Sequence, residues 1–113
     1  MYDIKEGRWY NEMPCLLIGR SNHSSCCLGN YLYVCGGYSK NRSFMLDIEY
    51  LRLDVLDKTS RWQQTKPVVY SHMMNYASLN PLMAPISETE ILVLGGLDRL
   101  SFRSDGVILN TVT

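Results

Sequence analysis

The pattern of apolar and polar positions along the chain predicts short strands separated by turns. Residues 24–28 and 31–35 are apolar or alternating runs. Gly29 and Asn30, which separate them, readily adopt the positive φ values of a tight turn. The sequence therefore predicts an antiparallel hairpin over residues 24–35.

Gly36 and Gly37 end this hairpin, because two residues without Cβ atoms weaken extended structure and permit a sharp bend. The polar residues 38–43 are predicted as a loop. Residues 45–55 then resume an alternating pattern, which predicts a third strand. A helix over residues 45–58 is the alternative interpretation of this stretch.

A fourth strand is predicted over residues 61–65, which carry Trp62 and are closed by Pro67. Residues 57–60 have the composition of a turn between the third and fourth strands. The sequence between residues 24 and 65 thus predicts one antiparallel unit of four strands.

A second unit follows with weaker signals at its start. Residues 68–70, 76–79 and 80–81 give only weak strand and turn signals, and the first strand of this unit is the least defined. Residues 90–94 predict a clear strand that ends at Gly95 and Gly96. Residues 97–103 are predicted as a loop and residues 106–109 as a further strand, so about three strands are expected here.

Two landmarks recur in the same order along the chain. Trp9, preceded by Arg8, returns as Trp62 after Arg61, a shift of 62 − 9 = 53 positions. The apolar strand with its glycine pair recurs with a shift of 95 − 36 = 59. Self-similarity at a period near fifty is typical of repeat architectures, in which each unit stacks on its neighbours to bury its apolar face.

Composition places the chain among ordinary globular proteins, since 46% of its 113 residues are hydrophobic and 19% are charged. Eleven basic residues balance eleven acidic ones, so bulk charge favours neither nucleic acid nor an anionic membrane as a partner. No apolar run approaches the roughly 20 residues that span a bilayer, and residues 1–6 lack the apolar region of a signal peptide. A cytoplasmic location is expected.

The candidate chemistry is sparse. His23 and His72 fit no zinc spacing, and the four cysteines (Cys15, Cys26, Cys27 and Cys35) are interpreted as reduced thiols. The carboxylates of the third strand and the following turn (Asp47, Glu49, Asp54 and Asp57) are expected to be solvated. No paired acid and base, nucleophile or copper-like set of His and Tyr stands out. The sequence therefore predicts no cofactor, no metal and no enzymatic activity.

The order of these features resembles the kelch repeat: an apolar strand, a glycine pair directly after it, a strand with Tyr50, and then Trp62 after a short turn. The resemblance implies an all-β fragment of a kelch-type β-propeller with four-stranded antiparallel blades and an incomplete ring. Residues 1–14 would then hold the last strand of a preceding blade, residues 15–67 a complete blade and residues 68–113 a partial blade.

The resemblance also assigns structural roles to individual residues. The glycines Gly36, Gly37, Gly95 and Gly96 would let the chain turn after the second strand of each blade. The aromatic residues Tyr50, Trp62 and Trp9 would fill the space between adjacent blades. The resemblance thus implies that they are scaffold residues and not functional ones.

By this resemblance the protein is expected to be a protein-protein interaction module, with a scaffold or substrate-recognition role. The alternative is a fragment of a kelch-propeller enzyme, an oxidase or hydrolase, with its active site on other blades. The loops after the glycine pairs are basic, with Lys40 and Arg42 in one and Arg99 and Arg103 in the other. Because equivalent loops of a propeller emerge on one face, these cations are predicted to bind an acidic peptide segment of a protein partner.

Overall fold

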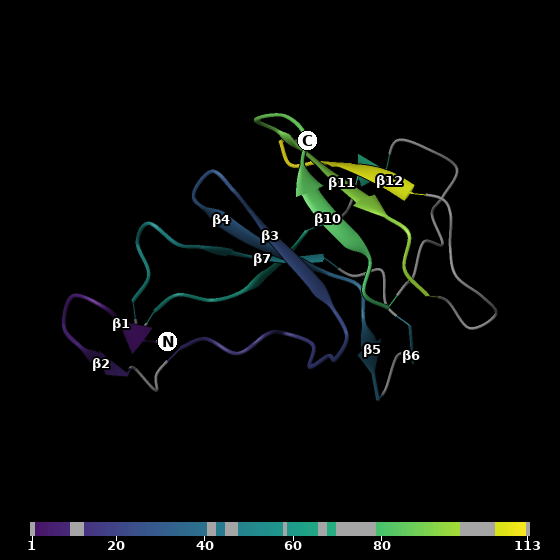
Figure 1. The fold of residues 1–113 in the computed structure, drawn as a ribbon. Helices are drawn as coiled ribbons and strands as arrows, with labels where there is room; N and C mark the ends of the chain where they lie inside the picture. Colours follow the sequence, from purple (N-terminus) through teal and green to yellow (C-terminus); the bar gives the residue numbers. More distant parts are fainter. Residues whose placement is uncertain are drawn as a thin grey trace.

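The chain folds into antiparallel sheets joined by turns and extended segments (Figure 1). The computed structural model describes residues 2–9, 13–40, 43–44, 48–57, 59–65, 68–69, 79–97 and 106–112. In these ranges there is no helix, and hence none with the length and apolar character to span a membrane. The predicted all-β fold class is confirmed. In chain order the strands are β1 (Tyr2–Asp3), β2 (Arg8–Trp9), β3 (Ser24–Leu28), β4 (Tyr31–Cys35), β5 (Tyr38–Ser39), β6 (Ser43–Phe44), β7 (Ile48–Arg52), β8 (Gln63–Thr65), β9 (Val68–Val69), β10 (Leu82–Pro85), β11 (Glu90–Leu94) and β12 (Gly106–Asn110).

Sheet I consists of β3, β4, β7 and β8 in that spatial order, and all of its pairs are antiparallel. Leu28 lies opposite Tyr31, so Gly29 (φ 60°) and Asn30 form the predicted two-residue turn. The predicted third and fourth strands are confirmed within the narrower bounds of β7 and β8. The alternative helix is wrong for the described part of residues 45–58, where β7 pairs with β4 instead.

Sheet II has the order β10-β11-β12-β9, and its middle strands are those that the sequence predicts. Its first strand, β10, was not predicted, because Ala84 and Pro85 disfavour strands and no alternation marks this segment. As an edge strand it tolerates the proline. β9 falls where a weak first strand was expected, but it pairs with β12 at the opposite edge of the sheet.

Two short hairpins lie outside these sheets. The polar residues 38–43, predicted as a loop, contain β5, which pairs with β6 so that Tyr38 lies opposite Phe44. The backbone of Tyr38 also pairs with Ser21, which extends the polar segment away from sheet I as a ribbon. At the start of the chain β1 pairs with β2, and Tyr2 lies opposite Trp9.

The first three strands of each sheet repeat one arrangement, whereas the fourth strand comes after them in the chain in sheet I and before them in sheet II. Ser24 pairs with Cys35 in sheet I, and Leu82 pairs with Leu94 in sheet II, with shifts of 82 − 24 = 58 and 94 − 35 = 59. The repeat that the sequence predicts therefore exists in the backbone as well.

The connections outside the strands repeat in the same way. The bridge between Ser21 and Tyr38 recurs between Leu79 and Leu97, 79 − 21 = 58 residues later. Asn22 and Asn80, which follow the first partner of each bridge, both have a positive φ, of 56° and 48°. Asparagine is one of the few residues other than glycine that adopts this conformation at low cost.

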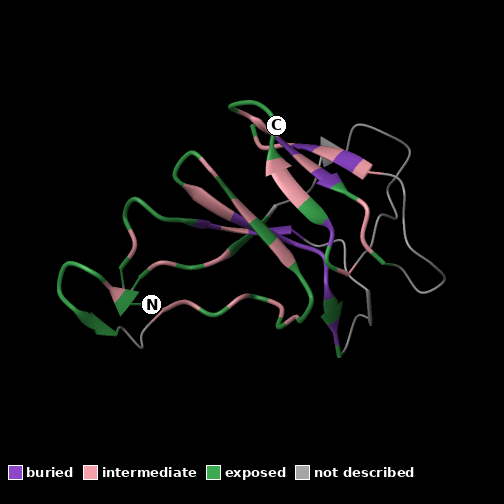
Figure 2. Cartoon of the chain, viewed as in Figure 1, coloured by how far each residue is buried: buried purple, intermediate pink, exposed green. Residues whose placement is uncertain are grey.

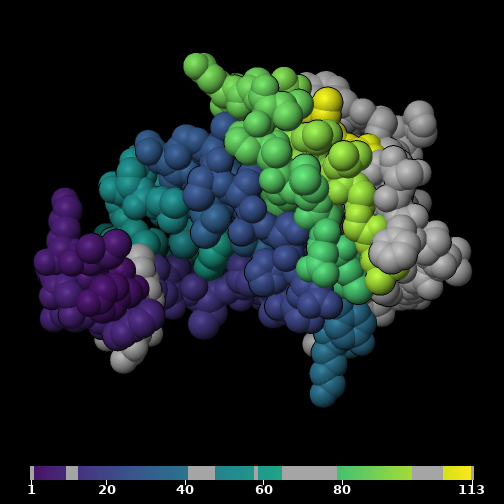
Figure 3. Space-filling model, in the orientation of Figure 1, coloured from purple at the N-terminus to yellow at the C-terminus, as the bar shows by residue number. Residues whose placement is uncertain are grey.

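The main apolar core lies between the two sheets. Its buried members come from both sheets, whose buried segments are purple in Figure 2. They are Tyr33, Cys35, Ile48, Ile91, Val93, Val107 and Leu109. In Figure 3 the green surface of β10 and β11 lies directly against the blue surface of β3 and β4. Burial of this apolar area is the dominant force that holds the two sheets together.

Sheet I also buries its other face. Val34, Glu49 and Leu51 alternate with the core residues and are buried, although sheet II lies on the opposite side. The backbone amides of Leu17 and Ile18 donate to the Glu49 carboxylate, so the extended segment of residues 13–20 covers this face.

Candidate functional site

The two glycine pairs lie at the same end of the two sheets, which we call the glycine-pair end. The starts of β3 and β10 are joined there, because the Asn80 amide donates to the Asn22 carbonyl at 2.8 Å. The Ser24 hydroxyl also donates to the Pro81 carbonyl. Since β4 and β11 end opposite these starts, the glycines that follow them lie at this end too.

Each of the four predicted glycines has a positive φ, as a turn at that position requires. The values are 77° and 95° for Gly36 and Gly37, and 71° and 94° for Gly95 and Gly96. At Gly37 the backbone also approaches Ser21 closely, and a Cβ atom there would lie 2.5 Å from the Ser21 carbonyl oxygen. These glycines let the chain leave each sheet sharply.

The structure places one of the four predicted basic residues. Lys40 follows β5 in the turn of the β5-β6 hairpin and is exposed. Arg42, Arg99 and Arg103 lie outside the described residues. The clustering of these cations at the glycine-pair end therefore stays a prediction.

Tyr50 packs on the side of sheet I that faces sheet II. Its ring lies 5.8 Å from that of Tyr31 and 6.0 Å from that of Tyr33, measured between centroids. Its hydroxyl donates to Gln63 Oε1 at 2.7 Å. Tyr50 thus contacts the core between the sheets and also ties β7 to β8.

The two tryptophans differ in their surroundings. Trp62 is partly buried, and its indole Nε1–H donates to the Pro14 carbonyl at 3.1 Å. Trp9 is 71% exposed and stacks at a tilt on the Tyr2 ring, 5.1 Å away. Trp62 therefore anchors residues 13–20 over the face of sheet I that points away from sheet II. Trp9 packs on Tyr2 in the β1-β2 hairpin and does not lie between the two sheets.

Replacing Trp62 with phenylalanine is expected to lower the free energy of unfolding by about 1 kcal/mol, because an aromatic ring remains while the indole hydrogen bond to Pro14 is lost. Urea denaturation followed by circular dichroism measures the change. Trp9→Phe is the matched control and should cost less than half as much, because Trp9 is mostly exposed. Equal losses in the two variants would contradict the anchoring role of Trp62.

A buried ion pair at the edge of the outer face was not foreseen from the sequence. The side chains of Arg20 and Glu49 are fully buried, and Arg20 Nη2 lies 2.6 Å from Glu49 Oε2. Arg20 Nη1 also donates to the carbonyl of Gly36 at 3.1 Å. The pair therefore links residues 13–20, strand β7 and the first glycine pair.

The expectation that Glu49 is solvated is wrong. Its carboxylate is fully buried and accepts two backbone N–H groups, from Leu17 at 2.6 Å and Ile18 at 3.2 Å, besides the Arg20 guanidinium. Such a set of donors satisfies a buried carboxylate. The one signal in the sequence is a carboxylate next to Ile48 in an otherwise buried strand, which does not identify the partner.

The other described carboxylates of this region are exposed, as expected. The Arg52 guanidinium donates to the Asp54 carboxylate at 2.7 and 3.1 Å, and this hydrogen bonding lowers the pKa of Asp54. The side chain and backbone of Thr59 donate to Asp57 and lower the pKa of that carboxyl as well. These contacts shape a surface turn, and they provide no buried general acid or base. Asp47 lies outside the described residues.

Metal-binding chemistry gains no support from the described residues, where no group of three or more His, Cys, Asp or Glu side chains could hold an ion. His23 is exposed and His72 lies outside the described residues. All four cysteines are free thiols. Burial is the main cause that raises the pKa of Cys26, with a smaller contribution from Cys27.

The fold and its repeated registers define a class of protein built from stacked four-stranded antiparallel sheets. Residues 19–50 match the family model of the Kelch motif, and this segment runs from the residue before Arg20 through β3 and β4 into β7. This match confirms the resemblance to the kelch repeat over residues 19–50, and the number of blades stays a prediction. A search of curated proteins gives no match to the chain. The unit boundaries predicted at residues 14 and 67 stay predictions.

Proposed function

We propose that this protein is a protein-protein interaction module of kelch type, with a scaffold or substrate-recognition role in the cytoplasm and no enzymatic activity. The observation that carries this proposal is the Kelch motif over residues 19–50, which covers three strands of a four-stranded sheet and the glycine pair with the loop that follows it. A rigid sheet that presents loops is a general solution for binding other proteins. No observation on the described residues favours the alternative, an enzyme with its active site on other blades.

The proposed binding surface is the glycine-pair end. Both glycine pairs lie there, and each is followed in the sequence by a basic segment. Lys40 is exposed beyond Tyr38, which is itself 45% exposed. With Arg42, Arg99 and Arg103 the surface would offer four cations, and arginine forks suit carboxylates. The proposed partner is an acidic peptide segment of another protein.

A double charge reversal tests this function. Arg42→Glu with Arg99→Glu is expected to weaken binding of a fluorescein-labelled peptide rich in Asp and Glu at least tenfold, and wild-type binding should weaken as salt rises. Fluorescence anisotropy with the full chain measures both effects.

The matched control carries the same change of net charge in the β1-β2 hairpin, which lies apart from β5 and β6 in Figure 1. Lys5→Glu with Arg8→Glu changes two exposed cations of the β1-β2 hairpin and should leave the affinity within about twofold. If the two double variants bind the acidic peptide equally well, the glycine-pair end is not the binding surface.

A further inference from the structure

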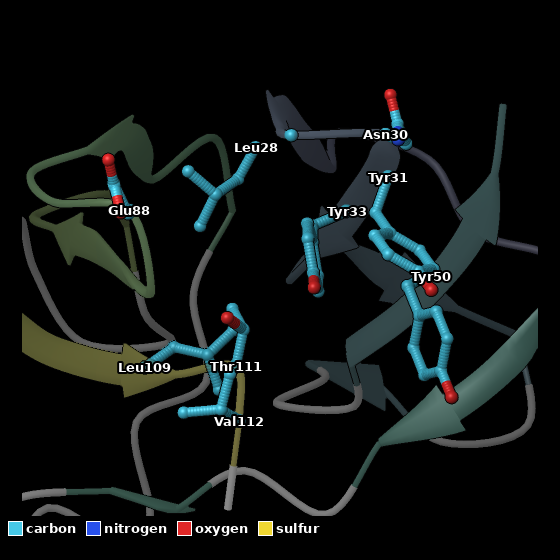
Figure 4. A pocket seen from close by; sticks show the side chains of 10 residues that line it. Leu28, Asn30, Tyr31, Tyr33, Tyr50, Glu88, Leu109, Thr111 and Val112 are labelled. Carbon is cyan, nitrogen blue, oxygen red and sulfur yellow. The ribbon is translucent and has the colours of Figure 1, made fainter. Parts of the chain in front are cut away.

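A hollow of about 550 Å³ lies between the two sheets at the end opposite the glycine pairs (Figure 4). The turn at Gly29 and Asn30 and the turn at Glu88 border it, and both connect the first two strands of a sheet. Its volume is within the range of ordinary small-ligand pockets, about 300–1,000 Å³. Because this pocket lies at the end opposite the glycine pairs, it is separate from the basic loops of the proposed function.

One side of this pocket is aromatic. Tyr31, Tyr33 and Tyr50 line it from sheet I, and the three ring centroids lie 5.8 to 6.3 Å apart. The rings are tilted or edge-on to one another, so they do not stack into a closed block. Ring faces carry partial negative charge and attract cations.

The opposite side, in Figure 4, is formed by sheet II. Leu109 belongs to β12, Thr111 and Val112 follow it, and Glu88 lies in the turn between β10 and β11. Glu88 is the charged residue of the lining, and it is exposed. Among the described residues its carboxylate has no hydrogen-bond or ion-pair partner.

Burial is the main cause that raises the pKa of Tyr33, and the side-chain hydrogen bond to Thr111 opposes it. The Tyr33 phenol is therefore uncharged at neutral pH. The other nine residues that line the pocket are neutral, so the formal charge of its lining comes from Glu88. An uncharged aromatic wall with a carboxylate opposite favours a cation that also has an apolar surface.

We propose that this pocket binds an organic ammonium group, with its methyl or methylene surface against the tyrosine rings and its charge toward Glu88. Choline chloride is the first probe, titrated into the full chain and followed by the amide NMR signals of Gly29, Asn30 and Thr111. Saturable shifts are expected with a Kd on the order of 1–10 mM. Acetate at the same ionic strength should produce no saturable shift.

Matched variants test the assignment of charge and aromatic surface. Glu88→Gln is expected to weaken choline binding about threefold to tenfold, and Tyr31→Leu by a similar factor. Glu90→Gln removes a carboxylate two residues away that does not line the pocket and should change the affinity less than twofold. The proposal is overturned if choline gives no saturable shift, if acetate matches it, or if Glu88→Gln and Glu90→Gln behave alike.

A second comparison identifies the source of the ammonium group. A peptide that contains trimethyllysine should compete with choline if the natural ligand is a modified side chain of a partner protein. Saturable binding of choline that the peptide does not displace would assign the pocket to a small molecule. Failure of both probes would reject the pocket proposal and leave the acidic-peptide surface untouched, because the two sites lie at opposite ends of the sheets.

Discussion

Replacing Glu49 with alanine is expected to lower the free energy of unfolding by about 3 to 5 kcal/mol, because it leaves the fully buried Arg20 guanidinium without its counter-charge. The Leu17 and Ile18 amides would also lose their acceptor. A fully buried donor without a partner costs about 1–3 kcal/mol, and these two part-buried amides add less than that. Since a small domain has a total stability of about 5–15 kcal/mol, this single change should shift the urea midpoint strongly.

Asp54→Ala is the matched control for this prediction. Asp54 also pairs with an arginine, Arg52, but the pair is on the surface, where such contacts contribute about 0–1 kcal/mol. A midpoint close to that of the wild type is therefore expected. Similar losses of stability in Asp54→Ala and Glu49→Ala would mean that burial does not determine how much each ion pair contributes to the free energy of unfolding.

A double variant keeps the prediction testable if Glu49→Ala does not fold. At the equivalent register position sheet II has Val107, which lies opposite Val93 as Glu49 lies opposite Val34. Sheet II is thus an apolar version of the same position. Arg20→Met with Glu49→Val should fold and unfold at a higher urea concentration than a variant that removes Glu49 alone, because no buried charge remains unpaired. A double variant that is no more stable than the Glu49 variant alone would show that the two side chains are not coupled.

The parts of the fold that could be predicted are those with sequence signals at both ends. β3 and β4 were predicted with the observed bounds, because a glycine-asparagine turn separates them and a glycine pair ends the second. β11 was predicted for the same reasons, with its own glycine pair at the end. Glycine pairs are strong signals because positive φ values exclude most other residues.

The parts that could not be predicted depend on contacts between distant segments. Arg20 and Glu49 are 29 residues apart, and their burial requires residues 13–20 to lie across sheet I. β10 has no alternation, so only its pairing with β11 identifies it as a strand. The position of β9 beside β12 is likewise set by tertiary packing, since two valines alone do not specify an edge.

The two ends of the sheets differ in the charge of their residues. Each glycine pair is followed in the sequence by a basic segment, whereas the lining of the tyrosine-lined pocket at the other end contains one carboxylate. The chain has no net charge, so this contrast arises from placement and not from composition. The two proposals assign an acidic segment to one end and a cationic group to the other, so the two binding tests use probes of opposite charge.

Replacing Gly37 with alanine is expected to destabilise the chain by about 3 kcal/mol or more. Gly37 has a φ of 95°, which L-residues rarely adopt, and strain of this kind costs about 1–3 kcal/mol. The added Cβ would also lie 2.5 Å from the Ser21 carbonyl oxygen and 3.1 Å from the His23 nitrogen. Both are backbone atoms, so relief of the clash requires the segment before β3 to move. Urea denaturation of the variant measures the loss.

Substitutions at two other glycines distinguish the cost of backbone strain from the cost of the steric clash. Gly29 has a φ of 60° but no atom within 4 Å of its would-be Cβ, so Gly29→Ala should show the backbone strain alone, about 1–2 kcal/mol. Gly19 has neither a positive φ nor a close neighbour, and Gly19→Ala should change the free energy of unfolding by less than about 1 kcal/mol. The expected order of loss is therefore Gly37, then Gly29, then Gly19. If Gly37→Ala costs no more than Gly29→Ala, the close approach of the glycine pair to Ser21 does not contribute to stability, and its role is confined to the turn.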